Sequence, residues 1–294
     1  MNAASTWTTA ELQAIILARE LADGEVGIVG TASDVQVAAC NLARAMHAPS
    51  LSWVSGPLGT VNADAGTLLP TADARLIRHA EAVVDLSVMI DVIDWRPGFF
   101  DFAILGAMQV DRYGNLNTVV IGDHARPKVR GPGVIGTSPL AAFAKHFFVL
   151  LARHDRQNLV ERVDFISAVG HYRGGSSRAS ELGLETEGPR LVVTPLAVLD
   201  FHPVTRSMQL RSVHPGVSVA EVVARTGFAL DVPPDVATTP PPTGRELAVL
   251  RRRVDRTGIL RRGRSDTRSQ RLADRPARPM SAGTTHTRTK PCRT

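Results

Sequence analysis

The sequence predicts an α/β fold built on a largely parallel sheet. Through the first 60 residues, amphipathic stretches alternate with short apolar runs in the order helix, strand, turn, helix, strand. The 294 residues are 44% hydrophobic and 21% charged, a composition typical of a globular chain with a sizeable core. Clusters of glycine and proline separate the later apolar runs, as expected where strands end in loops.

The first helix is predicted from its capping pattern. Thr8 and Glu11 have the spacing of a capping box, and apolar residues recur at helical intervals after them. The apolar run over 51–54 stops abruptly in a Ser-Gly-Pro turn, which is typical of a buried strand that ends at the rim of a sheet. The elements expected in this part are a helix over 9–24, a strand over 26–29, a turn over 30–33, a helix over 34–47 and a strand over 51–54.

The rest of the chain is predicted to be rich in strands before a helical end. Residues 113–115 supply turn chemistry between two apolar runs. Residues 202–206 join two alternating runs as an antiparallel hairpin, and Ser218 with Glu221 caps a helix. The expected elements are strands over 100–111, 116–122, 145–153 and 160–170, hairpin strands over 190–201 and 207–215, and helices over 218–227 and 245–255.

The charge distribution predicts one folded domain followed by a basic tail. The formal net charge is +6, yet residues 261–294 hold nine Arg and one Lys against two Asp and have almost no large apolar side chains. Such a segment cannot bury a core, so we expect a disordered, Arg-rich tail. The expected domain spans 1–260, with its core at about 5–232 and a linker and helix over 233–260.

Composition also bounds the partners and the compartment. Without the tail the net charge is −2, and no basic stripe or aromatic-rich RNA motif occurs, so nucleic acid is not an expected partner, although the tail leaves an RNA or a membrane surface open. No stretch approaches the ~18–20 apolar residues of a membrane span, and the N-terminus lacks the pattern of a signal peptide. Because only Cys40 and Cys292 are present, no disulfide framework is indicated, and a cytoplasmic location is expected.

General catalytic patterns are sparse. The nine histidines show no HxxxH or HxH spacing beside a carboxylate, so no metal site is expected. The chain has no GxSxG nucleophile elbow. Isolated histidines such as His79, His146 and His154 are expected to be surface or capping residues.

The stretch over 106–140 is the part most compatible with chemistry. Its glycines permit close approach of the backbone, and several N–H groups can point at one oxyanion or phosphate. Lys128 and Arg130 either pair with phosphates or face solvent, and spacing alone does not decide between these. The turn over 30–33 either cradles a phosphate or serves as a tight connection. The residues by themselves therefore predict an α/β domain with a glycine-lined ligand edge.

Several stretches, in order along residues 8–255, carry a resemblance to a known family. The most specific is GAMQVDRYGNLN at 106–117. The others are TAELQAIILARELADGE at 9–25, VGT at 29–31, HAP at 47–49, SG at 55–56, IGD at 121–123, PK at 127–128, Arg130, ELGL at 181–184, PRLVVT at 189–194 and TGFALDV at 226–232. Together they resemble the β subunit of the family I coenzyme A transferases, of the glutaconate CoA-transferase type.

This resemblance implies a CoA-transferase-type, NagB/RpiA-like α/β fold, with an open sheet, flanking helices and a C-terminal antiparallel hairpin. It implies a homologous α subunit as partner, in an αβ or α2β2 assembly with the site where the two subunits meet. Coenzyme A would be a substrate, and no cofactor would be bound permanently. In the family, a glutamate of the β subunit attacks the acyl-CoA thioester, and an acyl-glutamyl anhydride and then a glutamyl-CoA thioester form.

The family places this glutamate directly before a Ser-Gly pair, where this chain has Val54, and residues 50–62 contain no acidic side chain. A related branch of hydrolases, which open rings of CoA thioesters in steroid degradation, also lacks it and uses a glutamate of the α subunit. QVDRYGN and the SVHPGV at 212–217 resemble that branch, but the branch has an arginine in a GVRG loop where this chain has GVIG at 133–136. Transfer, hydrolysis and a non-catalytic subunit that binds acyl-CoA therefore stay open.

The matched positions give the candidate site residues. No side chain of this chain is expected to be catalytic by itself, and Val54 is expected to contact the acyl group. The loop glycines are expected to offer backbone N–H groups to an oxyanion or to coenzyme A. The candidates fall in three groups: a strand end at Val54, Ser55 and Gly56; a binding loop with Lys128, Gly131, Gly133 and Gly136; and a structural turn near the site at Tyr113, Gly114 and Asn115.

Overall fold

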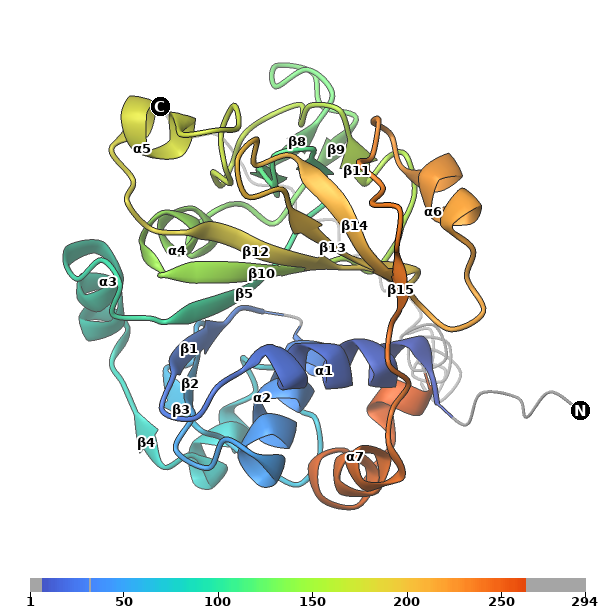
Figure 1. The fold of residues 1–294 in the computed structure, drawn as a ribbon. Coiled ribbons are helices and arrows are strands. Elements are labelled where there is room, and N and C mark those ends of the chain that lie inside the picture. Colours follow the sequence, from blue (N-terminus) through green and yellow to red (C-terminus); the bar gives the residue numbers. More distant parts are fainter. Residues whose placement is uncertain (1–6, 32, 263–294) are drawn as a thin grey trace, which may run out of the picture. The chain divides into compact units, whose positions relative to one another are not determined.

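The computed structural model describes residues 7–31 and 33–262. The chain up to Arg261 forms one unit, and the predicted tail over 261–294 lies almost entirely outside the described residues. This unit is built around a ten-stranded sheet in the order β15-β14-β13-β12-β10-β5-β1-β2-β3-β4 (Figure 1). Its central strands are parallel: β2 (Ser52–Ser55), β1 (Val26–Val29), β5 (Phe102–Gly106), β10 (His146–Leu150) and β12 (Gly188–Val193).

The central strands are buried on both faces, which explains their nearly continuous apolar sequences. Successive side chains point to opposite faces, so that Trp53 belongs to one apolar core and its neighbour Val54 to the other. The first core is packed against α1 (Thr9–Glu20) and α2 (Asp34–Met46) (Figure 1). The second core includes residues of α3 (Leu86–Trp95) and α4 (Thr137–Phe143).

Local signals placed the first elements correctly. The capping box of α1 is present, with the Thr8 hydroxyl accepting from the Glu11 N–H and the Glu11 carboxylate accepting from the Thr8 N–H. The predicted strand over 26–29 is confirmed as β1. The first helix ends at Glu20 rather than at the predicted residue 24, and α2 follows the prediction to within a residue.

The predicted C-terminal antiparallel hairpin is confirmed. It consists of β13 (Ala197–Phe201) and β14 (Met208–Val213), and a second hairpin joins β12 to β13, because the run over 190–201 bends at residues 194–196. The remaining strands of the large sheet are β3 (Thr60–Val61), β4 (Ala82–Val83) and β15 (Ala237–Thr238).

Besides the run over 190–201, three predicted strands are wrong in extent. The run over 100–111 is divided into β5 and β6 (Gln109–Asp111), which lies in a separate small sheet in the order β11-β6-β7. The run over 116–122 is divided in the same way into β7 and β8, and the run over 160–170 is mostly irregular. Its N–H groups at Ser167 and Ala168 donate to the Leu116 carbonyl instead of forming a continuous ladder. The short strands are β7 (Leu116–Asn117), β8 (Val120–Ile121), β9 (Val129–Arg130) and β11 (Leu159–Val160).

The C-terminal part of the unit packs back on α1. Here α7 (Gly244–Val249) continues into a π-helical turn over Leu250–Val254. Arg251 on this turn forms a two-pronged ion pair with the buried Glu11, with N···O distances of 2.7 and 2.9 Å. Shorter helical elements are the 3-10 helix Ala74–His79, α5 (Ser177–Leu182) and α6 (Val219–Arg225). Among the described residues, no helix has the length and apolar character to cross a membrane.

Candidate active site at the carboxyl edge of the sheet

Val54 lies near the carboxyl end of β2, between two other strands. It is paired with Ile28 of β1 and with Val61 of β3, and only 8% of it is exposed. Its apolar cluster includes Met89 and Ile93 from α3. The chain order places β2 on one side of β1 and β5 on the other, so the carboxyl end of β1 is a topological switch point, where open α/β sheets bind ligands. Val54 is thus an apolar side chain next to the expected ligand crevice.

The residues that follow Val54 are held in place by hydrogen bonds. The buried Ser55 hydroxyl donates to the Thr71 carbonyl at 2.7 Å, and the Gly56 N–H donates to the Val29 carbonyl at 2.9 Å. The Thr71 hydroxyl in turn donates to the Gly30 carbonyl at 2.9 Å. The Ser55 hydroxyl is therefore a structural link between the ends of β1 and β2, and no base lies beside it in these contacts.

The glycine loop is packed on Thr118. The Thr118 hydroxyl donates to the Gly133 carbonyl at 2.8 Å, and the Gly133 N–H donates to the Thr118 carbonyl at 3.2 Å. The Gly131 N–H donates to the Val119 carbonyl at 2.8 Å, and a Cβ at position 131 would lie 2.1 Å from the Thr118 carbonyl oxygen. Glycine is required at 131 by this close approach. The N–H groups of both glycines are engaged within the chain, so in this conformation they are not available to an oxyanion.

The other two loop candidates are differently placed. Gly136 precedes the first turn of α4 and has a φ of −113°, and Lys128 lies on an exposed turn before β9. The Lys128 side chain forms no ion pair within the described residues. Among the described residues, no hydrogen bond joins this loop directly to the strand end at Val54.

The Tyr113-Gly114-Asn115 segment is a tight turn organised by Asp111. The Asp111 carboxylate accepts from the N–H groups of Tyr113 and Asn115 and from the Asn115 amide. Gly114 has a φ of +71°, and a Cβ there would lie 2.7 Å from ring atoms of Phe201 and Pro189. The aspartate was not singled out as a site residue. Burial raises the pKa of the Asp111 carboxyl and outweighs the hydrogen bonds, which lower it. The contacts of Asp111 indicate a structural role.

A second structural centre is Arg178, which the sequence analysis missed. Its guanidinium is almost fully buried and donates to the carbonyl oxygens of Ala141 and Ala142 in α4 and to those of Val169 and Gly170. Burial lowers the pKa of Arg178 to about 10. Gly170 also donates to the Asn115 side chain, so Arg178 connects the Asp111 turn to the helix that follows the glycine loop.

The expectation for two histidines is wrong. His146 and His154 were expected at the surface or as caps, but both are buried, because they lie at the start of β10 and just beyond its end. His154 is hydrogen-bonded to the hydroxyls of Thr194 and Thr226, and burial lowers its pKa to about 4. His79 is exposed, as expected. Within the described residues, no group of three or more His, Cys, Asp or Glu side chains is arranged to hold a metal ion.

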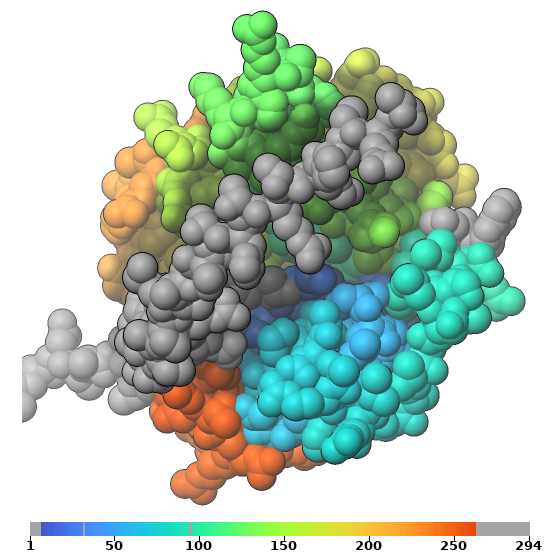
Figure 2. All heavy atoms as spheres, turned by 180° about the vertical axis from the view of Figure 1, so that it is seen from behind, coloured from blue at the N-terminus to red at the C-terminus, as the bar shows by residue number. Residues whose placement is uncertain are grey.

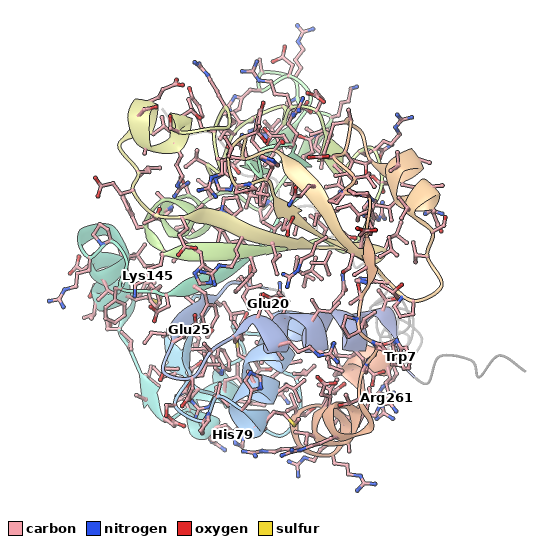
Figure 3. The ribbon with its side chains drawn as sticks, in the orientation of Figure 1. Trp7, Glu20, Glu25, His79, Lys145 and Arg261 are labelled. Atoms are coloured by element: carbon pink, nitrogen blue, oxygen red, sulfur yellow. The ribbon has the colours of Figure 1, made fainter. Side chains whose placement is uncertain are left out.

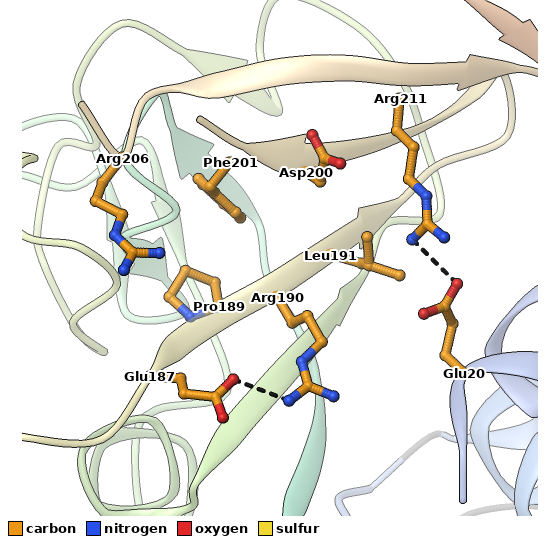
Figure 4. A pocket seen from close by; sticks show the side chains of 9 residues that line it. All are labelled: Glu20, Glu187, Pro189, Arg190, Leu191, Asp200, Phe201, Arg206 and Arg211. Atoms are coloured by element: carbon orange, nitrogen blue, oxygen red, sulfur yellow. Dashed lines mark hydrogen bonds and ion pairs between the residues drawn. The ribbon is translucent and has the colours of Figure 1, made fainter. Parts of the chain in front are cut away.

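Charged side chains gather away from the carboxyl edge. A cavity of about 420 Å³ contains the ion pairs Glu187–Arg190 and Glu20–Arg211, near the end of α1 and the strands β12 to β14 (Figure 4). At the amino edge, Lys145 pairs with Asp101, and Glu25 lies on the same side (Figure 3). None of the predicted site residues lines the cavity that contains the ion pairs Glu187–Arg190 and Glu20–Arg211.

The fold and its carboxyl edge can be compared with known proteins. The model of the coenzyme A transferase family matches residues 11–225, which is more than half of the chain. The chain belongs to the coenzyme A transferase family.

Curated relatives match the chain over nearly their full length, and each is named as one subunit of an enzyme. The β subunit of the 3-oxoadipate CoA-transferase of Pseudomonas knackmussii is 36% identical over 86% of this chain and 95% of its own. The β subunit of the glutaconate CoA-transferase of Acidaminococcus fermentans is 27% identical over 78% of this chain and 85% of its own. The cholesterol ring-cleaving hydrolase IpdB subunit of Mycobacterium tuberculosis is 27% identical over 84% of this chain and 95% of its own. This CoA-transferase-family chain therefore has both transferase and hydrolase relatives.

Solved structures support the same fold. Glutaconate coenzyme A-transferase of A. fermentans superposes with a TM-score of 0.78 at 24% identity, over 87% of this chain and 98% of that one. The decarboxylase AibA/AibB superposes with a TM-score of 0.73 at 27% identity, over 86% of this chain and 97% of that one. The CoA-transferase-type open sheet predicted from the sequence is thus confirmed.

Proposed function

We propose that the chain is the β subunit of a two-subunit enzyme that acts on acyl-CoA thioesters and draws its reactive carboxylate from the α subunit. One observation carries this proposal: the position before the Ser-Gly pair is Val54, buried among apolar side chains at the carboxyl end of β2. A valine neither attacks a thioester nor moves a proton, and Ser55 is committed to Thr71. The end of β2 therefore presents an apolar surface to a substrate.

In the transferase form of this proposal, the partner's carboxylate attacks the thioester carbonyl and expels coenzyme A as a thiolate, which gives an acyl anhydride. The thiolate then attacks the enzyme's own carbonyl of the anhydride and releases the acyl group as a free carboxylate. An acceptor carboxylate repeats these steps in reverse and leaves as the new thioester. A carboxylate suits this role because its anhydride and its thioester both stay reactive.

The hydrolase form is favoured by a different observation. The chain resembles hydrolase subunits over 84% of its length, and no acidic side chain follows Val54 until Asp64. In this form the partner's carboxylate acts as a base and takes a proton from water, which then attacks the substrate. Both forms need the α subunit, and they differ in the acceptor, which is a carboxylate in the first and water in the second.

The experiment is to produce the chain with its cognate α subunit and to follow coenzyme A in two assays. One assay measures transfer to an added carboxylic acid, and the other follows hydrolysis of the CoA ester by mass spectrometry, which detects both release of free coenzyme A and a ring opening that keeps the thioester. We expect Val54→Ala to retain activity within a few-fold, while Glu→Gln at the α subunit's glutamate removes it. The Ala variant should unfold about 1–2 kcal/mol more easily, because it loses buried methyl groups.

The substitution Val54→Glu separates the two forms further. If it creates or increases transfer between carboxylates, the position still has the geometry of the family's nucleophile. If the complex binds acyl-CoA but neither transfers coenzyme A nor hydrolyses the bound ester at the thioester or at a ring, the chain is a scaffold subunit and both enzymatic forms are overturned. The buried free thiol of Cys40 agrees with a reducing compartment, so we place the enzyme in the cytoplasm.

A further inference from the structure

Large apolar side chains are exposed along one segment of the chain. Figure 2 shows this segment, in blue-green, at the surface of the molecule, and in Figure 1 it holds β4 and α3. We call it the α3 surface. It consists of Ile77, Val83, Leu86, Val88, Ile90 and Phe99, each between 42% and 56% exposed. Soluble monomers rarely expose more than a few hundred Å² of contiguous apolar surface, so a concentration of this kind indicates a surface that another molecule covers.

The exposed side of the helix is mostly apolar, although Ser87 and Asp91 are exposed there as well. Met89 and Ile93 are buried on its inner side, while Leu86, Val88 and Ile90 are 56%, 51% and 42% exposed. Its sequence, LSVMIDVIDW, contains two aspartates and no cation. A helix that is solvated on one side is expected to be polar there, so three large apolar side chains on the exposed side of α3 favour a surface that is covered.

The neighbouring strand adds an open sheet edge. β4 is the last strand in the order of the ten-stranded sheet, and it pairs with β3 alone among the described strands. Both of its residues, Ala82 and Val83, are exposed. An exposed apolar strand at a sheet edge is prone to pair with another chain, and native proteins cover or charge such edges.

The α3 surface is one helix away from Val54. Met89 and Ile93, on the inner side of α3, belong to the same apolar cluster as Val54. A chain bound to the outer side of α3 is therefore separated by this one helix from the strand end where the reactive group is missing. A second copy of this chain would bring only another Val54, so the occupant that completes the chemistry is a different chain.

We propose that the α3 surface is the docking site of the α subunit. This rests on the function proposed above, because the argument for a different chain depends on a reactive group that this chain lacks. The complementary surface has an apolar centre that covers Val88 and Ile90, with a Lys or Arg side chain opposite the exposed Asp91.

The test compares charged substitutions on two exposed helical surfaces. Val88→Glu and Ile90→Glu place a carboxylate in the proposed contact, whereas Val223→Glu makes the same change on α6, where the valine is 40% exposed. Affinity for the cognate α subunit is measured by titration calorimetry, and thermal unfolding of the isolated chain checks folding. We expect each α3 variant to bind at least tenfold more weakly, because a buried unpaired charge is costly. The control should bind within twofold of the unmodified chain.

A second measurement does not depend on a destabilising change. A benzophenone maleimide attached at Val88→Cys is expected to cross-link to the α subunit on illumination, and the same probe at Val223→Cys is not. Normal affinity of both Glu variants, or absence of the Val88 cross-link, overturns the docking site. Self-association of the chain that the α3 substitutions abolish assigns this surface to a second copy and also overturns it.

The outcomes separate this inference from the proposed function. If the α subunit docks through the α3 surface but the complex neither transfers coenzyme A nor hydrolyses the CoA ester, the docking site stands and the enzymatic function fails. If the complex is active and the α3 variants bind normally, the function stands and the docking site fails. If the unmodified chain does not bind the α subunit, both are overturned.

Discussion

Val54 and Trp53 are neighbours in the chain but belong to opposite faces of the sheet. Trp53 donates from its indole N–H to the Asn41 side chain at 2.9 Å, within the core under α1 and α2. Val54 packs on the side of α3. A change at position 54 therefore acts on the α3 side and leaves the larger part of the helix packing intact, which is why substitutions there are suitable probes of chemistry.

Two of the loop glycines are predicted to differ in how well they tolerate a side chain. Gly131→Ala should lower the free energy of unfolding by about 1–3 kcal/mol, because its Cβ would lie 2.1 Å from the backbone oxygen of Thr118. Gly136→Ala should change it by less than about 0.5 kcal/mol, since the nearest atom is Leu140 Cδ1 at 3.8 Å. Urea unfolding measures both, and equal losses would contradict the packing on Thr118.

Among the secondary-structure elements, those with local signals were predictable and those that depend on tertiary contacts were not. Thr8 with Glu11 and Ser218 with Glu221 marked two helix starts that the structure confirms. α3 was not predicted, because its exposed side carries Leu86, Val88 and Ile90 and its sequence is therefore apolar on both sides of the buried Met89. Its one local sign is Asp85, whose carboxylate accepts from the Ser87 N–H.

The site was predictable to the same limited degree. The similarity of sequence pointed to Val54 and to the turn at 113–115. The sequence analysis missed that Asp111 holds this turn, although its contacts with the turn are local. It also missed Arg178, which donates to five backbone carbonyls in three segments. The contacts of Arg178 with α4 join residues 36 and 37 positions apart, and neither periodicity nor spacing encodes them.

Arg178 gives the prediction for the element scale. Arg178→Ala should lower the free energy of unfolding by at least about 3 kcal/mol, because several buried carbonyl oxygens lose their donor. Arg173→Ala is the matched control: its guanidinium is 69% exposed and pairs with Glu181, so its loss should cost no more than about 1 kcal/mol. Chemical denaturation measures both. If the two substitutions lower the free energy of unfolding by similar amounts, the hydrogen bonds from Arg178 to α4 are not needed for stability.

Across the whole molecule, buried imidazoles are predicted to limit stability in acid. Burial lowers the pKa of His146 and His154 to about 4 and that of His171 to about 3. Between pH 6.5 and 4 the unfolded chain binds protons that the folded chain does not, so stability falls as the pH falls through this window. Each such histidine should cost roughly 2 kcal/mol between pH 7 and pH 5.

Unfolding by urea at pH 7 and at pH 5 measures this dependence. His154→Gln should reduce the difference between the two free energies, whatever it does to their absolute values. His79→Gln, at an exposed position, should leave the difference unchanged. A pH dependence that is the same in both variants would assign the acid sensitivity to other groups.

A different group governs the more acidic range. Burial favours the protonated form of Glu11, but hydrogen bonds from Arg251 and from the Thr8 N–H outweigh it and hold the pKa of Glu11 below its usual value. The stability from this pair is fully present above about pH 4.5 and is lost as the pH falls through the lowered pKa. The ion pair thus ties α1 to the turn after α7 at all pH values where the enzyme is expected to work.

The same junction brings the two ends of the folded unit together. The Thr8 hydroxyl donates to the Leu260 carbonyl at 2.9 Å, and Trp7 and Arg261 lie near one another (Figure 3). A short peptide can therefore join these ends, while new termini are opened at the exposed Val204 between β13 and β14. Because the two ends of the folded unit are adjacent, a circularly permuted chain that starts with β14 should reach the same packing.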